Sequence, residues 1–190
     1  MKFLFCTVLL LFVITFSFSQ SAIRFTQLDK SPMDMIYYPV NYPIQKIQPG
    51  KTLEPLIARV IYSRPQKMGR KVFGELVEDG KIWRLGANEA TEIEFFRDVK
   101  INQKKLKKGR YTLYAIETKN EWTLIFNSEL DTWGAFKYDS AKDVLRVTCS
   151  VQKASEPIEA FSMQFEKTSA EACRLYIGWD EVLILLPISW

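Results

Sequence analysis

The side chains best suited to hold a ligand are concentrated between residues 62 and 95, in segments that also contain Gly and Pro. The six candidates are Arg64, Arg70, Trp83, Arg84, Asn88 and Glu89. Guanidinium groups bind carboxylates and phosphates through paired hydrogen bonds, and a tryptophan face stacks on sugar rings or cations. Amide and carboxylate groups can bind the hydroxyls of a sugar. The segment therefore predicts a shallow cleft for an envelope glycan, a peptide or an anionic small molecule.

The same residues have a second interpretation, in which they hold the protein together instead of binding a ligand. Arg84 could pair with Glu89, Asn88 could cap a turn, and Trp83 could belong to the core. Arginine–glutamate networks of this kind fix loops in β-domains. Both interpretations stay open at the level of sequence.

The chain contains no histidine, and this excludes several classes of chemistry. A Ser-His-Asp or Cys-His catalytic centre is impossible, as is a zinc or haem site with histidine ligands. An enzyme built on this chain would be a histidine-free hydrolase that uses Glu89, with Arg84 or Arg70 stabilising negative charge. The acidic residues lack the spacing of a calcium-binding loop, so we expect no metal and no cofactor.

Strands must position these residues, because apolar and polar side chains alternate along most of the chain. In residues 91–95, for example, Ile93 and Phe95 share one face while Glu92 and Glu94 share the other. Strands are predicted at residues 56–62, 91–95, 110–116, 121–126, 144–151, 158–165, 173–179 and 182–186, and a helical turn at 135–142. This pattern predicts an all-β fold, an antiparallel β-sandwich or flattened barrel, in a single domain.

The first 19 residues have the pattern of a secretory signal peptide. Lys2 precedes an apolar run, and Ser17 and Ser19 are small residues at the spacing that a signal peptidase requires. Cleavage before Gln20 would export the protein, to the periplasm or beyond, and would leave no transmembrane span. An uncleaved membrane anchor is the alternative. Residues 20–51, rich in Pro and Tyr, are predicted to form an extended arm packed on a domain of residues 52–190.

Two cysteines, Cys149 and Cys173, follow the predicted signal peptide. An exported chain can oxidise a pair of thiols. The two cysteines fall on the first and third strands of a predicted meander, however, and such strands lie about 10 Å apart, beyond disulfide reach. We therefore expect two buried free thiols, unless their strands belong to facing sheets.

The remaining surface features point to weaker interactions. The net charge of +4 is too small to indicate a nucleic-acid partner. Lysines are dense between residues 100 and 108, where they either decorate an exposed hairpin or contact anionic lipid or polysaccharide. Trp133, in a Trp-Gly-Ala-Phe segment, and Trp190 are predicted to cover sheet edges.

Two blocks of the sequence resemble a known family. The blocks SRPQKMGRKVFGELV (63–77) and WRLGANEAT (83–91) are similar to the signature of the bacterial domain-of-unknown-function family 2911, and the resemblance continues through residues 99–114, 121–138 and 143–147. It implies an exported, strand-rich domain, and it brings no established reaction or ligand. Leu85 and Arg110 depart from the pattern, where smaller polar residues are expected.

Overall fold

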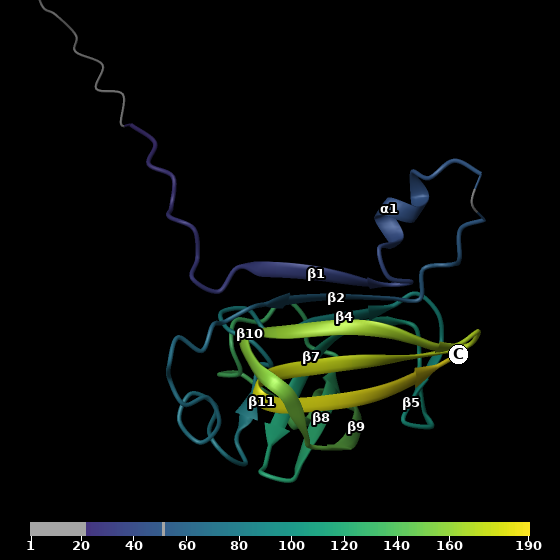
Figure 1. Cartoon of the computed structure of the whole chain (residues 1–190). Helices are drawn as coiled ribbons and strands as arrows, with labels where there is room; N and C mark the ends of the chain where they lie inside the picture. Colours follow the sequence, from purple (N-terminus) through teal and green to yellow (C-terminus); the bar gives the residue numbers. More distant parts are fainter. Residues whose placement is uncertain (1–21, 51) are drawn as a thin grey trace, which may run out of the picture.

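A computed structural model describes residues 22–50 and 52–190, and the predicted signal peptide lies outside them. In the described residues, two antiparallel sheets pack face to face (Figure 1), which confirms the predicted all-β fold. None of the helices found there is long and apolar enough to cross a membrane.

The larger sheet has seven strands in the described part of the chain. In spatial order they are β1 (Met33–Tyr38), β2 (Ala58–Ser63), β4 (Glu92–Phe95), β7 (Gly109–Glu117), β8 (Glu121–Asn127) and β9 (Asp143–Ser150), with β3 (Ile82–Trp83) also paired to β7. Because β4 and β3 pair with successive parts of β7, they lie end to end along one side of it.

The smaller sheet covers one face of the larger sheet. Its strands, in spatial order, are β10 (Gln152–Ser169), β11 (Ala172–Ser189), β5 (Val99–Ile101) and β6 (Lys104–Leu106). The two strands predicted at 173–179 and 182–186 are one strand, β11. Asp180 has a positive φ of 52° where the register with β10 is irregular, so the chain bends there without leaving the sheet.

The N-terminal arm contributes structure of its own. As expected of a Pro-rich segment, its strand β1 is an edge strand, paired only with β2. A short helix that the sequence did not predict, α1 (Tyr42–Lys46), follows it, with Pro43 in the first turn, where proline is tolerated. The turn predicted within 135–142 is present as the 3-10 helix η1 (Ser140–Lys142).

The core between the sheets is rich in aromatic rings. Trp83 stacks on Trp179 with ring centroids 6.1 Å apart, and its edge meets Trp122 at 5.5 Å and Phe161 at 5.3 Å. These rings come from strands of both sheets. Such pairs add about 0.5–1.5 kcal/mol each to the stabilisation from buried area. This cluster is therefore a main packing contact between the two sheets.

Both cysteines are free and buried, as predicted. They lie on β9 and β11, in different sheets rather than in one meander. Burial raises the pKa of the Cys149 thiol to about 11 and that of Cys173 to about 12, so both stay protonated and unreactive at neutral pH.

One buried residue at the end of β7 carries a carboxyl group. Glu117 is only 3% exposed, and its Oε2 atom has no hydrogen-bond partner. It lies directly opposite Trp122 in the β7–β8 register, on the face that meets the aromatic core. Burial, together with the nearby Asp79 carboxyl, raises the pKa of Glu117 from 4.5 to about 7.

This pKa makes the stability of the fold dependent on pH. The folded state binds the Glu117 proton more tightly than the unfolded state, so stability should fall as the pH rises from about 4.5 through 7, by on the order of 2 kcal/mol. Glu117→Gln should abolish this fall and be more stable than wild type at pH 8, as measured by urea unfolding across the pH range. The exposed Glu121→Gln is the control, and an unchanged pH slope in Glu117→Gln would contradict the assignment.

Candidate functional site

Trp83 belongs to the core rather than to an open cleft. The residue is 7% exposed, and its Nε1 atom donates a hydrogen bond to the carbonyl of Gly86 at 3.1 Å. This bond folds the chain back just after β3. Its ring is therefore not available to stack on a ligand at the surface.

The loop that follows Trp83 is fixed from two sides. The Ser63 hydroxyl accepts from the amide of Ala87 at 2.8 Å and donates to the carbonyl of the same residue. The Thr91 hydroxyl donates to the carbonyl of Leu85. Gly86 has a φ of 156°, and a Cβ there would lie 3.1 Å from the Ser63 hydroxyl, so only glycine fits. These conspicuous residues of the signature therefore have architectural roles.

Asn88 and Glu89 connect this loop to a second loop, residues 128–139. The carbonyl of Asn88 accepts from the amide of Gly134 at 2.9 Å, and Glu89 forms an isolated β-bridge with Trp133. Next to them, the amide of Ala90 donates to the carbonyl of Thr132 at 3.0 Å. Two predicted site residues thus position a segment that the sequence interpretation placed at a sheet edge.

Arg64 and Arg70 are occupied by contacts within the protein. The Arg64 guanidinium pairs with Asp34 at 3.0 Å and donates to the Ser162 hydroxyl at 2.8 Å, joining β1 to β10. Arg70 donates to the carbonyls of Gln66 and Lys67, within its own loop. Arg64 lines a cavity of about 340 Å³ between these strands. Neither arginine forms an ion pair with Glu89 in the described part of the chain.

Arg84 differs from the other two arginines. It is half-buried, its Nε atom is buried without a hydrogen-bond partner, and burial lowers the pKa of its guanidinium. It takes part in none of the ion pairs among residues 22–50 and 52–190. Arg84 lies just after β3. Within β3, Trp83 faces the core, whereas Ile82 packs against Tyr114 on the opposite face of the larger sheet.

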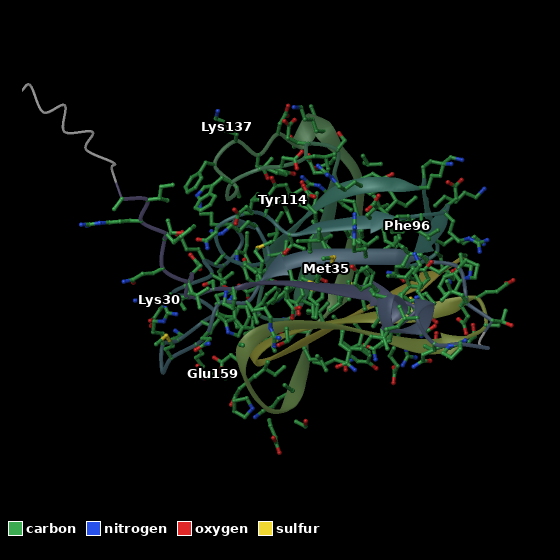
Figure 2. All side chains as sticks on the ribbon, turned by 90° about the horizontal axis from the view of Figure 1, so that it is seen from above. Lys30, Met35, Phe96, Tyr114, Lys137 and Glu159 are labelled. Atoms are coloured by element: carbon green, nitrogen blue, oxygen red, sulfur yellow. The ribbon has the colours of Figure 1, made fainter. Side chains whose placement is uncertain are left out.

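That opposite face carries a cavity of about 600 Å³. Loop 128–139 and η1 cover this part of the sheet. The aromatic part of the lining comes from Tyr114, Trp133 and Phe136, and most of the rest is polar and charged. The polar side chains are Glu129, Asp131, Thr132, Lys137, Asp139 and Lys142. Figure 2 shows Lys137 on the side of the molecule where Tyr114 lies.

Two aromatic rings at this cavity are open to solvent. Trp133 is 60% exposed and Phe136 is 83% exposed. Between them, Gly134 has a φ of 68°, and a Cβ at that position would lie 2.7 Å from the Phe136 ring. The Phe136 ring therefore lies directly over the Gly134 backbone, which only a glycine permits.

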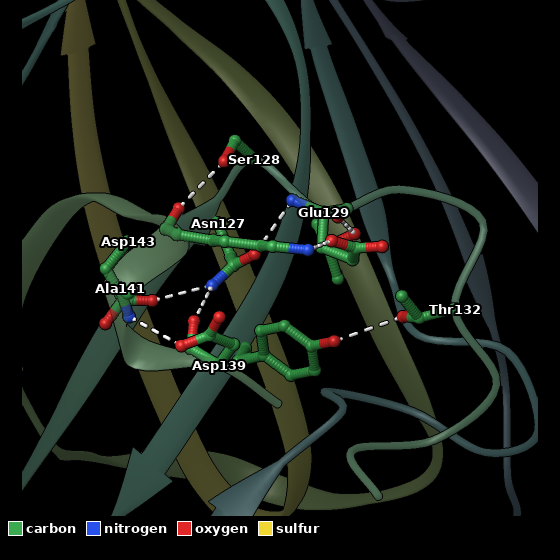
Figure 3. Close-up of polar contacts among 10 residues, drawn as sticks. Asn127, Ser128, Glu129, Thr132, Asp139, Ala141 and Asp143 are labelled. Carbon is green, nitrogen blue, oxygen red and sulfur yellow. Dashed lines mark hydrogen bonds and ion pairs between the residues drawn. The ribbon is translucent and has the colours of Figure 1, made fainter. Parts of the chain in front are cut away.

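A polar network holds the loop that carries these rings (Figure 3). Asn127, at the end of β8, is 1% exposed; its amide nitrogen donates to the Asp139 carbonyl and the Asp143 carboxylate, and its oxygen accepts from the Glu129 amide. Lys142 pairs with the Glu129 carboxylate. The two ends of the loop are thus tied together through one buried side chain, which gives the cavity a defined wall.

The floor of the cavity is equally ordered. Tyr114, 2% exposed, shares a hydrogen bond of 3.1 Å with the Thr132 hydroxyl, and its ring meets Tyr138 edge-on. Tyr138 donates to Asp143, and burial, followed by the Asp143 carboxylate, raises its pKa to about 12. The Tyr138 phenol therefore remains a neutral hydrogen-bonding group at physiological pH.

The lining of the larger cavity is suited to binding a sugar. Exposed rings next to carboxylates, ammonium groups and a hydroxyl can bind the apolar faces and the hydroxyls of a sugar. Glu89 lines a smaller cavity of about 240 Å³, which shares Asp131 and Thr132 with the larger one. No group of three or more potential metal-ligating side chains was found in the described residues.

Trp133 and Phe136 are the site residues that the sequence interpretation missed. The sequence pattern that could have identified them is a Trp and a Phe on either side of Gly134, in a polar segment between two predicted strands. Residue type alone could not show that Trp133 is open while Trp83 is buried, because Trp83 lies on the core face of a strand and Trp133 lies in a loop outside the core.

Comparisons with known proteins support the family resemblance. The curated proteins and the solved structures gave no match. A family described as "Protein of unknown function (DUF2911)" matches residues 47–188, which cover β2 to β11 apart from the last residue of β11. The match covers most of the chain, and the protein therefore belongs to the DUF2911 family.

Proposed function

We propose that this protein is an exported binding module of the bacterial envelope, and that it holds a glycan in the cavity beside Trp133 and Phe136. The observation that carries the proposal is the pair of open aromatic rings at the rim of a cavity of about 600 Å³ whose other lining is largely polar. Carbohydrate sites combine these two features, because a sugar has apolar faces and a rim of hydroxyls.

The charges around the cavity favour a glycan over a small anion. Three carboxylates and two ammonium groups line it, and one ammonium, that of Lys142, already pairs with Glu129. An anion would meet a surplus of negative charge there. Export rests on the signal-like pattern of residues 1–19, which places the protein where envelope polysaccharides are found.

The alternative, a histidine-free hydrolase that uses Glu89, has less support. Glu89 is exposed, and no ion pair joins it to Arg70 or Arg84 in the described residues. Arg64 and Arg70 are held by other partners. The binding experiment below also includes peptides as alternative ligands.

The first test removes the larger exposed ring. Trp133→Ala should weaken binding to the best ligand from an array of envelope polysaccharide fragments and peptides by about tenfold or more, measured by isothermal titration calorimetry, because stacking on the indole is lost. Its melting temperature should stay close to wild type, since the ring is largely outside the core.

Phe96→Ala is the matched control, because Phe96 is an exposed ring, 40% accessible, that does not line this cavity. Equal losses of affinity in both variants, or an array without any glycan ligand, would contradict the proposal. Cleavage of a bound glycan that Glu89→Gln abolishes would instead favour the hydrolase.

The second test displaces Phe136 without removing it. In Gly134→Ala the new methyl group would collide with the Phe136 ring, so the ring must move and glycan affinity should fall several-fold. Gly80→Ala is the control: Gly80 has nearly the same φ, 69°, and its Cβ would meet open space. Each variant should lose about 1 kcal/mol of stability through backbone strain, measured by urea unfolding. Unchanged affinity in Gly134→Ala would show that Phe136 does not contact the ligand.

A further inference from the structure

A second candidate binding site lies in the smaller sheet, on the hairpin of β5 and β6. Asn102 and Gln103 form its two-residue turn, both with positive φ, as this kind of tight hairpin requires. Val99, Ile101 and Leu106 are buried in the core between the sheets. The alternation along each strand therefore directs Lys100 and Lys105 to the outer face.

These two lysines lie side by side on adjacent strands. The β5–β6 register places Lys100 directly opposite Lys105. Neither forms an ion pair within residues 22–50 and 52–190, whereas the neighbouring Lys107 pairs with Asp98 at 2.8 Å. Like charges directly opposite on adjacent strands destabilise a sheet. The pair of lysines therefore lowers the stability of the hairpin, although a neutral residue at either position would avoid the repulsion.

The lysines surround a cavity. It has a volume of about 320 Å³, and its lining includes Lys100, Lys105, Lys107, Asp98 and Trp190. Figure 1 shows β5 beside the C-terminal end of β11, which brings Trp190 to this hairpin. The Trp190 ring rests on Tyr38, with ring centroids 5.4 Å apart, so it forms a fixed wall. Val99 and Leu106 complete the lining. Lys107 pairs with Asp98, so Lys100 and Lys105 give the lining its net positive charge.

Every cationic side chain at this cavity is a lysine. Lysine ammonium groups act as point charges, and several of them can bind the oxygens of one phosphate from different directions. We propose that the cavity between Lys100, Lys105 and Trp190 binds a phosphate group, carried by a small phosphate ester or by the headgroup of an anionic phospholipid. This site is separate from the glycan cavity and does not depend on it.

The experiment is a titration of the folded protein with phosphate compounds at constant ionic strength. Inorganic phosphate and glycerol 3-phosphate are added separately while the backbone amide resonances of residues 99–106 are followed by NMR. Vesicles of phosphatidylglycerol, compared with vesicles of phosphatidylcholine, are tested by co-sedimentation. Binding of the soluble esters would identify a small ligand, and binding of phosphatidylglycerol vesicles alone would identify a lipid headgroup.

Two matched double variants distinguish binding at this cavity from a general effect of the protein's net charge. Lys100→Gln with Lys105→Gln should reduce affinity at least tenfold. Lys81→Gln with Lys119→Gln removes the same charge from exposed lysines that do not line this cavity, and should change affinity less than twofold. Equal losses in the two double variants, or no binding of any phosphate compound, would overturn the proposal.

Stability gives an independent readout. Lys100→Glu places opposite charges across the two strands, so it should raise the melting temperature by about 2 °C in low salt while abolishing phosphate binding. If Lys100→Glu is more stable than wild type and does not bind phosphate, the lysine pair serves ligand binding and not stability. Retained phosphate binding in Lys100→Glu would overturn the assignment.

Discussion

The hydrogen bond from the Trp83 indole to the Gly86 carbonyl links the core of this protein to its surface. The ring is fixed between the sheets by Trp179, Trp122 and Phe161, and the bond transmits that fixed position to the loop after β3. That loop in turn holds the segment with Trp133 through backbone bonds at residues 88 and 90. The open tryptophan of the candidate glycan site is therefore positioned by the buried one, through a chain of contacts that contains few flexible side chains.

Much of the fold could be predicted from alternation, and much of the site could not. The pattern Ile93, Glu94, Phe95 identified β4 because one face of that strand is buried and the other is not. The single long strand β11 was divided in two, because a bend at Asp180 resembles a turn in the sequence. The alternation of buried and exposed side chains along a strand is visible in the sequence as a two-residue period. The bridge between Glu89 and Trp133 joins two loops that are distant along the chain, and it leaves no such pattern.

The arginines illustrate the same limit. Arg64 and Arg70 are close together in a segment whose residue types favour anion binding, and nothing in their spacing indicates that they have different partners. Arg64 instead meets Asp34 and Ser162, which are distant along the chain and come close only because β1 and β10 lie at neighbouring edges of the two sheets. In the part of the chain that the structure describes, Arg84 forms no ion pair, and its Nε atom is buried without a hydrogen-bond partner.

The segment after β2 also has a consequence for the smaller sheet. The Pro65 carbonyl accepts from the Phe161 amide, and the Lys67 amide donates to the Glu159 carbonyl, so this segment runs along the outer side of β10. An uncovered strand there would offer a row of free backbone groups to any other extended chain. By bonding Glu159 and Phe161, residues 65–67 occupy the middle of that row, which disfavours the addition of a strand from another molecule at this place.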